Sequence, residues 1–253
     1  MQETNNVEYQ RAAPDHLLSG FVKCYWSVHN PDQEEKKFSI LPDGHFDLLF
    51  RAVEGEAVRI SISGLWNQET TSVVPGKATV FGLSFKLPAS EYILKESIAA
   101  LLNAEQDLPP DFWGLEIRDL SDFNSLVTIL QQKMQQRLCK NIDNRKLHLF
   151  DTLYASNGSI TAEEVSNTIL WSNRQISQYF KDQFGISLKS YCTILRYRAS
   201  FDHLNEKELY PQQNYSDQAH FIREVKKYSG VTPGVLAENQ NNRFIQLSTL
   251  KKE

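Results

Sequence analysis

Cysteine is scarce in this sequence of 253 residues: Cys24, Cys139 and Cys192 lie far apart and form no CxxC pair. Structural zinc sites and disulfide frameworks both depend on several cysteines at characteristic spacings. We therefore expect neither, and predict three buried, unreactive thiols in the reducing environment of the cytoplasm.

Long apolar runs are also missing. No stretch approaches the roughly 18 apolar residues of a membrane span, and the opening MQETNNVEYQ lacks the basic and then apolar order of a signal peptide. The composition, 41% hydrophobic and 23% charged, is typical of a globular chain with one large domain or two of ordinary size. No membrane partner is expected.

Motifs that would support catalysis are absent as well. The sequence has no GxSxG elbow, no phosphate-binding glycine loop and no dinucleotide fingerprint. In its front part His16, His29 and His45 form no HxH pair of the kind a metal-dependent barrel would use, and Cys24 has no obvious base as a partner. These absences predict a protein that is not an enzyme, with no catalytic residue, no metal and no cofactor.

One short stretch, ILPDGHFDLLF, nevertheless groups Asp43, His45 and Asp47. It could begin a catalytic or metal site, or it could form the turn of a hairpin and the strand that follows. Proline presets φ and glycine permits positive φ in a tight turn, so the hairpin is favoured, with Asp43 and His45 exposed near the turn. Asp47 would lie inside an apolar strand, where a buried carboxyl must find a hydrogen-bond partner.

Positive charge is unevenly distributed along the chain. Residues 1–144 carry 13 Lys and Arg against 20 Asp and Glu, a net charge of −7, whereas residues 145–253 carry 14 against 11, a net charge of +3. This division indicates two modules, and a polyanionic partner would meet the second one.

The front module is rich in predicted strands. Segments of β-branched and aromatic residues, separated by turn-forming residues, predict strands at 21–28, 45–50, 58–66 and 78–87. Apolar residues at helical spacing predict helices at 90–104 and 121–140. The predicted fold class is α+β, with a β-rich domain over residues 1–140, a linker over 141–150 and an all-α module beyond it.

The back module contains an internal repeat at an offset of 45 residues. FKDQFGIS at 180–187 matches VKKYSGVT at 225–232, and Gly185 pairs with Gly230. Each copy has the pattern of a helix whose apolar face points into a core and whose glycine ends it at the C′ position.

The opposite face of each predicted helix carries side chains suited to DNA. Arg and Gln can form bidentate bonds with base edges, Ala and Ile can contact a thymine methyl group, and Lys can contact phosphates. Each face could instead be the solvated side of an ordinary helical bundle, but two matching stripes at a fixed offset favour recognition helices. The stripe residues are Arg174, Ser177, Gln178 and Lys181 in the first copy and Ala219, Ile222, Arg223 and Lys226 in the second.

The residues before the first of these helices complete a helix-turn-helix pattern. TAEEVSNTIL begins with a capping box between Thr161 and Glu164, and the short turn Trp171-Ser172 follows it. A helix, a tight turn and a second helix with a polar outer stripe are typical of DNA-binding proteins.

These segments resemble the DNA-binding domain of AraC-type (AraC/XylS) transcriptional regulators. The resemblance rests on SNRQISQYFKDQFGISLKSYCTILRYRA and YSDQAHFIREVKKYSGVTPGVL. It implies a domain over 151–240 with two helix-turn-helix units joined by a long helix over 188–204, and a tail over 241–253. It also implies that both recognition helices enter successive segments of the major groove, and it adds Gln218 to the base-reading residues.

The chain departs from the family pattern between Ala199 and Tyr215. This segment is shorter than expected and contains Pro211, which would break a helix. The supporting helix of the second unit is therefore expected to be reduced to a turn or loop, which puts the contribution of the second recognition helix in question.

The front module resembles, through LPDGHFDLLF, SGLW and FGLSFKLPA, the N-terminal domain of a subset of AraC-type regulators. The resemblance implies a small cupin-like β-barrel or sandwich, followed by helices, that senses a ligand or mediates dimerisation. The helix over 121–138 could be a dimer face or could pack on its own sheet. Side chains that could line an effector pocket, or could simply fill the barrel, are Tyr25, Trp26, Phe46, Asp47, Leu48, Trp66, Phe81 and Phe85.

Together these patterns predict a cytoplasmic, sequence-specific transcriptional regulator of bacterial type. Its partners would be double-stranded DNA, a small-molecule effector, a second copy of the chain in a homodimer, and RNA polymerase if the protein is an activator. The alternative is a ligand-binding or protein-interaction module whose degenerate helix-turn-helix no longer reads DNA sequence.

Overall fold

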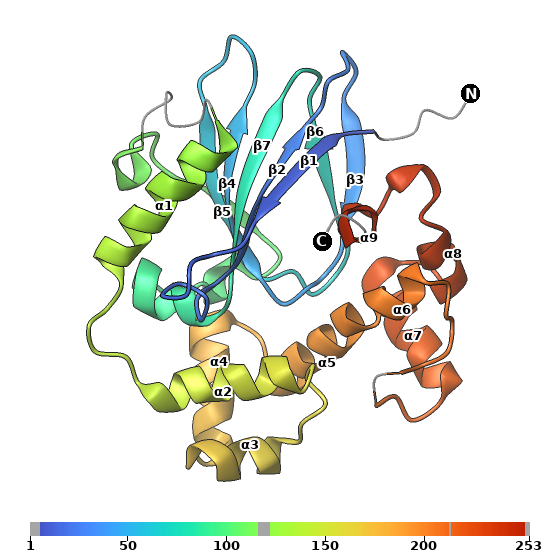
Figure 1. Cartoon of the computed structure of the whole chain (residues 1–253). Helices are drawn as coiled ribbons and strands as arrows, with labels where there is room; N and C mark the ends of the chain where they lie inside the picture. The colour runs from blue at the N-terminus through green and yellow to red at the C-terminus, as the bar shows by residue number, and fades with distance from the viewer. Residues whose placement is uncertain (1–5, 116–121, 213, 251–253) are drawn as a thin grey trace.

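The computed structural model describes residues 6–115, 122–212 and 214–250. An antiparallel β domain forms the front of the chain and a helical domain follows it (Figure 1), so the predicted α+β class is confirmed. In this described part, no helix combines the length and the apolar character that crossing a membrane requires.

Two sheets form the β domain. One has six strands in the order β1-β2-β7-β4-β5-β8, and the other pairs β3 with β6. The sequence patterns found β2, β4, β5 and β7 but missed the others, which are short and carry polar or mixed sequences. The strands are β1 (Glu8–Ala12), β2 (Val22–His29), β3 (Lys36–Ile40), β4 (Phe46–Ala52), β5 (Arg59–Ser63), β6 (Thr70–Val74), β7 (Thr79–Phe85) and β8 (Glu105–Asp107).

The six-stranded sheet has two unlike faces, because successive side chains of a strand point to opposite sides. On one face Leu48 and Leu83 belong to the main core of the molecule, which also takes in the helices. The other face meets β3 and β6, where a smaller apolar cluster includes Phe38 and Val80. The space between the two sheets is therefore separate from the main core.

Helix α1 (Phe123–Arg137) lies against the β domain on the side away from β3 (Figure 1). Its apolar stripe is buried in the main core, so this helix packs on its own chain and does not offer a free dimer face. Residue 121, where the helix was predicted to begin, lies outside the described residues. The buried stripe consists of Phe123, Leu126, Val127, Leu130 and Met134.

The segment after β7 is not the continuous helix that was predicted over 90–104. It forms a short π-helix, η1 (Ser90–Leu94), and a 3₁₀ turn, η2 (Ala99–Leu101), before β8. Lys95 has a φ of 63° and ends η1, so the helix cannot continue through this residue. The apolar residues of the segment instead pack against the rest of the fold in two separate places, through η1 and through η2.

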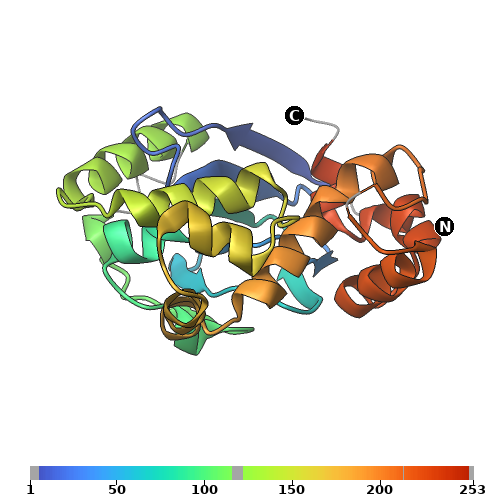
Figure 2. The ribbon, with the colours of Figure 1, turned by 90° about the horizontal axis from the view of Figure 1, so that it is seen from below.

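The helical domain fills the lower and right-hand parts of Figure 1, and Figure 2 shows it from below with α4 nearly end-on. Helix α2 begins inside the predicted linker, and the predicted long helix is divided into α5 and α6. No helix occurs in the described residues between α6 and α7, in agreement with the break expected at Pro211. A 3₁₀ turn, η3 (Phe112–Gly114), lies before α1, and the elements of the helical domain are α2 (Asn144–Ala155), α3 (Ala162–Ile169), α4 (Asn173–Phe184), α5 (Leu188–Ala199), α6 (Phe201–Asn205), α7 (Gln218–Ser229), α8 (Pro233–Glu238), η5 (Gln240–Asn242) and α9 (Ile245–Leu250).

Candidate nucleic-acid interface and ligand cavity

Helices α4 and α7 are built alike. Each has 12 residues and begins after a capping side chain, Ser172 or Asp217. Each ends at a glycine with a φ of 71°, Gly185 or Gly230, a conformation that other residues adopt at a cost. The capping residues are separated by the same offset as the glycines, so the sequence repeat is also a structural repeat.

The two faces of these helices differ in burial. Ile176 and Phe180 on α4, and Phe221 and Val225 on α7, are buried in the core. All nine side chains expected to contact DNA are exposed, so both stripes are accessible to a partner. These exposed residues are Arg174, Ser177, Gln178, Lys181, Gln218, Ala219, Ile222, Arg223 and Lys226.

Local hydrogen bonds distinguish the members of the stripes. Gln178 Nε2 donates to both carboxylate oxygens of Asp182, at 2.7 and 2.8 Å, and Gln218 Nε2 donates to the main-chain oxygen of Leu209 at 2.8 Å. These two amides would have to exchange their partners in order to read a base. By contrast, neither stripe arginine, Arg174 or Arg223, has an ion pair at salt-bridge distance with the described residues.

The C-terminal end of α4 is held by the β domain. Ser97 Oγ donates to the main-chain oxygen of Asp182 at 2.7 Å, and the Ile98 N–H donates to that of Gln183 at 3.0 Å. Gln183 Nε2 in turn donates to the Glu96 carbonyl at 3.0 Å. These bonds satisfy carbonyl groups that a helix end leaves unpaired, and they fix α4 to the segment that follows η1.

A second contact of α4 centres on Glu91 in η1. Its carboxylate accepts a hydrogen bond from the Tyr179 hydroxyl at 3.1 Å and forms an ion pair with Lys146 of α2 at 2.5 Å. The Lys146 ammonium also lies 4.7 Å from the centre of the Tyr179 ring. One acid of the β domain thus joins two helices of the helical domain.

The turn before β4 is a third joint between the domains. The Tyr191 hydroxyl of α5 donates to the Gly44 carbonyl at 3.0 Å and also bonds to the Tyr154 hydroxyl of α2 at 3.2 Å. A Cβ atom at Gly44 would lie 2.9 Å from Leu195 Cδ2, so glycine permits this close approach. The tight turn predicted from the sequence is therefore an interface element.

This joint corrects the prediction that Asp43 and His45 are exposed. The exposed fractions of their side chains are 29% and 10%, because α2 and α5 pack over the turn. The His45 ring stacks on Tyr154, with ring centres 6.3 Å apart. Asp43 Oδ1 accepts the His45 main-chain N–H at 3.0 Å, as an Asx turn does.

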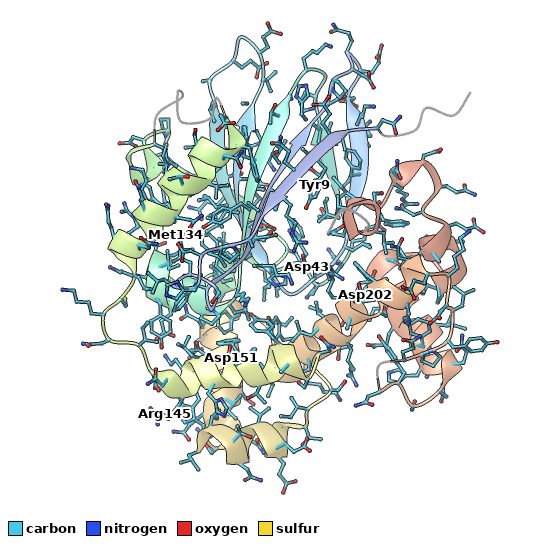
Figure 3. All side chains as sticks on the ribbon, in the orientation of Figure 1. Tyr9, Asp43, Met134, Arg145, Asp151 and Asp202 are labelled. Atoms are coloured by element: carbon cyan, nitrogen blue, oxygen red, sulfur yellow. The ribbon has the colours of Figure 1, made fainter. Side chains whose placement is uncertain are left out.

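A cavity of about 150 Å³ lies between the two sheets. Residues of both sheets line it, together with Asp43, which Figure 3 shows between the strands and α5. The helical domain contributes Arg198 of α5 and Gln246 and Thr249 of α9 to its wall. The cavity therefore lies at the contact between the β domain and the helical domain.

Only Trp26 and Asp47 of the predicted pocket residues line this cavity. Strand alternation explains the difference, because the other strand residues point to the opposite face of the six-stranded sheet. Trp66 lies partly exposed beyond β5 and away from the cavity wall. The residues that fill the main core are Tyr25, Phe46, Leu48, Phe81 and Phe85.

Asp47 has a hydrogen-bond partner, as predicted for a carboxyl inside an apolar strand. Its Oδ1 accepts from Ser84 Oγ at 2.5 Å, and Ser84 Oγ accepts from Trp26 Nε1 at 3.0 Å. Burial, and next the charge of Asp43, raise the pKa of Asp47 to about 7. Burial opposes ionisation of Asp43 also, but His45 and, to a smaller extent, Arg198 lower the pKa of that carboxyl.

The cysteines and potential metal ligands form no reactive centre in the described residues. Cys24 and Cys192 are buried, and burial raises the pKa of both thiols, that of Cys192 to about 11. Cys139 is half-buried. Within the same described ranges, no three His, Cys, Asp or Glu side chains group as a metal ion would require.

Comparison with known proteins adds two sequence relationships. Residues 10–107 match the family model described as "Domain of unknown function (DUF6597)". The chain is 28% identical over 100 residues to the uncharacterized HTH-type transcriptional regulator YtdP of Bacillus subtilis strain 168. The resemblance to AraC-type regulators is supported. The match covers 38% of this chain but 13% of that relative, so the chain spans a small part of its length.

Solved structures of ToxT from Vibrio cholerae are similar to this chain over most of its length. An apo ToxT variant from strain SCE256 gives a TM-score of 0.46 at 10% identity, covering 93% of this chain and 99% of ToxT. ToxT of strain O395 bound to (E)-4-(8-methylnaphthalen-1-yl)but-3-enoic acid gives 0.43 at 12% identity, with the same coverage of 93% and 99%.

Proposed function

We propose that this chain is a sequence-specific DNA-binding regulator of transcription whose β domain senses a small ligand, and that it is not an enzyme. The observation that supports DNA binding is the paired construction of α4 and α7. Two helices with identical lengths, side-chain caps and exposed stripes at equivalent positions are what a protein with two helix-turn-helix units presents to successive major-groove segments.

The charge of the helical domain is compatible with this role. Lys181 and Lys226 occupy equivalent positions in the last turns of α4 and α7 and are exposed. Lysines at the ends of recognition helices suit phosphate contacts, which position a protein without reading sequence. Arg174 and Arg223 would then supply base contacts, since guanidinium groups bind guanine edges bidentately.

The position of the cavity suggests how a ligand would affect DNA binding. Arg198 lies near the end of α5, before the second helix-turn-helix unit, and Gln246 lies in α9, after it. A ligand that contacts both would act on the two connections of that unit to the rest of the molecule. We propose that occupancy of the cavity changes the orientation of α7.

Two further partners stay predictions. A homodimer would have to use a surface other than the apolar stripe of α1, because this stripe is buried in the main core. Contact with RNA polymerase is expected only if the protein activates transcription.

The test is a selection of bound sites from random double-stranded DNA with the full chain. A regulator enriches one motif, and the double variant Arg174→Ala/Arg223→Ala loses that enrichment. Arg59→Ala is the matched control, because Arg59 is exposed on β5 and pairs with Asp107, away from both recognition helices. A ligand-binding or interaction module with a degenerate helix-turn-helix would enrich no motif, and this outcome would overturn the proposal.

A further inference from the structure

The cavity between the sheets combines hydrogen-bond acceptors with an aromatic wall. We propose that it binds a small organic cation, a primary ammonium carried on a compact apolar group. This inference rests on the proposed function, since it names the chemical class of the effector. It is derived from four features of the cavity: a carboxyl without a basic partner, an unpaired amide oxygen, an indole in the wall and a small volume.

The first feature is the pair of carboxyl groups. Asp43 Oδ1 lies 3.5 Å from His45 Nδ1, and His45 and the positive charge of Arg198 lower the pKa of this carboxyl. Asp47 accepts a hydrogen bond from Ser84, but no basic side chain in the described part of the chain lies within ion-pair distance of it. A cation in the cavity would supply the positive partner that the Asp47 carboxylate lacks.

The second feature is the amide of Gln246 in α9. Its Nε2 donates to the Leu41 carbonyl at 3.0 Å, which fixes the orientation of the amide because the oxygen could not donate there. Its Oε1 is buried and has no hydrogen-bond partner. Buried acceptors are normally paired, and Gln246 is part of the cavity wall. A ligand that donates several hydrogen bonds therefore suits this end of the cavity.

The third feature is the position of Trp26. A Cβ atom at Gly82 would lie 2.0 Å from Trp26 Cε2 and 2.1 Å from Cζ2, so the absent side chain lets the indole lie directly on β7. The indole is also part of the cavity wall. Tryptophan is the side chain that binds cations best through its ring face, and Asp47 is linked to this same tryptophan through Ser84.

The fourth feature is the size and polarity of the remaining walls. A cavity of about 150 Å³ admits a molecule of the size of benzene. Its far walls are apolar, with Val28, Phe38, Ile40, Val74 and Val80 among them. The ligand is therefore a compact apolar group with its charge at one end.

Basic side chains also line the cavity, and they define the competing ligand class. Arg11, Lys23 and Arg198 would favour an anion. However, Arg11 interacts with Cys24, Lys23 is exposed, and the charge of Arg198 acts on Asp43. The uncompensated group is the acid, which is why the cation is favoured over a carboxylate.

Three ligands of similar shape and different charge separate the classes. Isothermal titration of the full chain with benzylamine, benzyl alcohol and benzoate should show benzylamine binding at least about tenfold more tightly than the other two. Asp47→Asn, which keeps the shape and removes the charge, should abolish this preference. Asp107→Asn is the control, because this carboxyl is exposed on β8 and outside the cavity, and should leave the preference unchanged.

A pH series on the unaltered protein gives a second test that does not depend on the folding of a variant. Benzylamine affinity should rise between pH 6 and pH 8, because Asp47 ionises in this range while the amine stays protonated. Absence of benzylamine binding, a flat pH profile, or tighter binding of benzoate that is lost in Arg198→Gln would each overturn the proposal.

The selection from random DNA keeps this inference distinct from the proposed function. A recovered DNA motif together with no benzylamine binding overturns the ligand class and leaves the DNA-binding proposal intact. Benzylamine binding without any recovered motif supports the cavity assignment and overturns the role in DNA recognition.

Discussion

The hydroxyl of Tyr191 donates a hydrogen bond of 3.0 Å to the carbonyl of Gly44. Tyr191 belongs to α5, which leads from the first helix-turn-helix unit toward the second, and Gly44 belongs to the turn that carries Asp43 into the cavity. One hydrogen bond therefore connects the wall of the cavity with the helix that lies between α4 and α7 in the chain.

Replacing Tyr191 with phenylalanine tests this connection. The substitution removes the hydroxyl and leaves the buried Gly44 carbonyl without this donor, so we expect a loss of about 1–2 kcal/mol in the free energy of unfolding. Urea denaturation measures it. Tyr210→Phe is the control, because Tyr210 is 77% exposed, and this variant should unfold like the unaltered protein.

The stripe arginines should contribute to specific DNA binding. Arg174→Ala and Arg223→Ala are each expected to weaken binding to the selected site by about 1–3 kcal/mol, with a smaller loss on random DNA. Fluorescence anisotropy on both DNAs measures the difference. Equal losses on the two DNAs would show that these residues contact only phosphates.

The stripe lysines should act differently. Lys181→Ala and Lys226→Ala remove a phosphate contact each, so binding to specific and random DNA should weaken alike. The slope of log affinity against log salt concentration should decrease by about one unit for each substitution. Lys140→Ala, an exposed lysine beyond α1, should leave the slope unchanged.

Asp47 should make stability depend on pH. Its pKa is raised to about 7, mainly by burial, so its protonated form favours the folded state below the unfolded pKa near 4. This contribution is lost progressively as pH rises from about 4 through 7. Compared with Asp47→Asn, the unaltered protein should therefore lose stability between pH 5 and pH 8 in urea denaturation, and parallel curves for the two proteins would contradict the assignment.

Arg243 should hold the C-terminal helix against the β domain. Its guanidinium pairs with Glu69 at 2.8 Å and donates to Ser39 Oγ at 3.0 Å. Because the arginine is half exposed, Arg243→Ala should cost less than about 1 kcal/mol of global stability. Amide hydrogen exchange in α9 should nevertheless become faster, whereas Arg59→Ala, which breaks an exposed pair within one sheet, should not change it.

Helices α4 and α7 could be predicted because their signals are local. The capping box of Thr161 and Glu164 forms as expected, and Gly185 and Gly230 end their helices with positive φ. These features depend on residues three or four positions apart, so a short stretch of sequence is enough to specify them. A helix that ends at such a glycine occurs twice, 45 residues apart, and this repetition strengthened the prediction.

The cavity could not be predicted in the same way. Aromatic residues of the strands were the first candidates for the wall of a pocket. The alternation of side chains along a strand does not say which face of the sheet meets the main core. Tyr25 and Phe46 lie on the face that meets the main core, so they do not line the cavity. Arg198 and Gln246 are distant from Asp47 in sequence and reach the cavity only through the packing of the two domains. Asp47 itself was identified because an acid in an apolar strand requires a partner.

The bonds from Ser97 and Ile98 to the end of α4 make the two DNA-binding units unequal. The first unit is hydrogen-bonded directly to the β domain at the end of α4, whereas the second is joined through α5 and α9, which border the cavity. Under the proposed function, a ligand would leave the DNA sequence bound by α4 unaltered and would change the preferred distance between this half-site and the one bound by α7. Binding of the effector would then be measurable as a change in the preferred spacer length between the two half-sites.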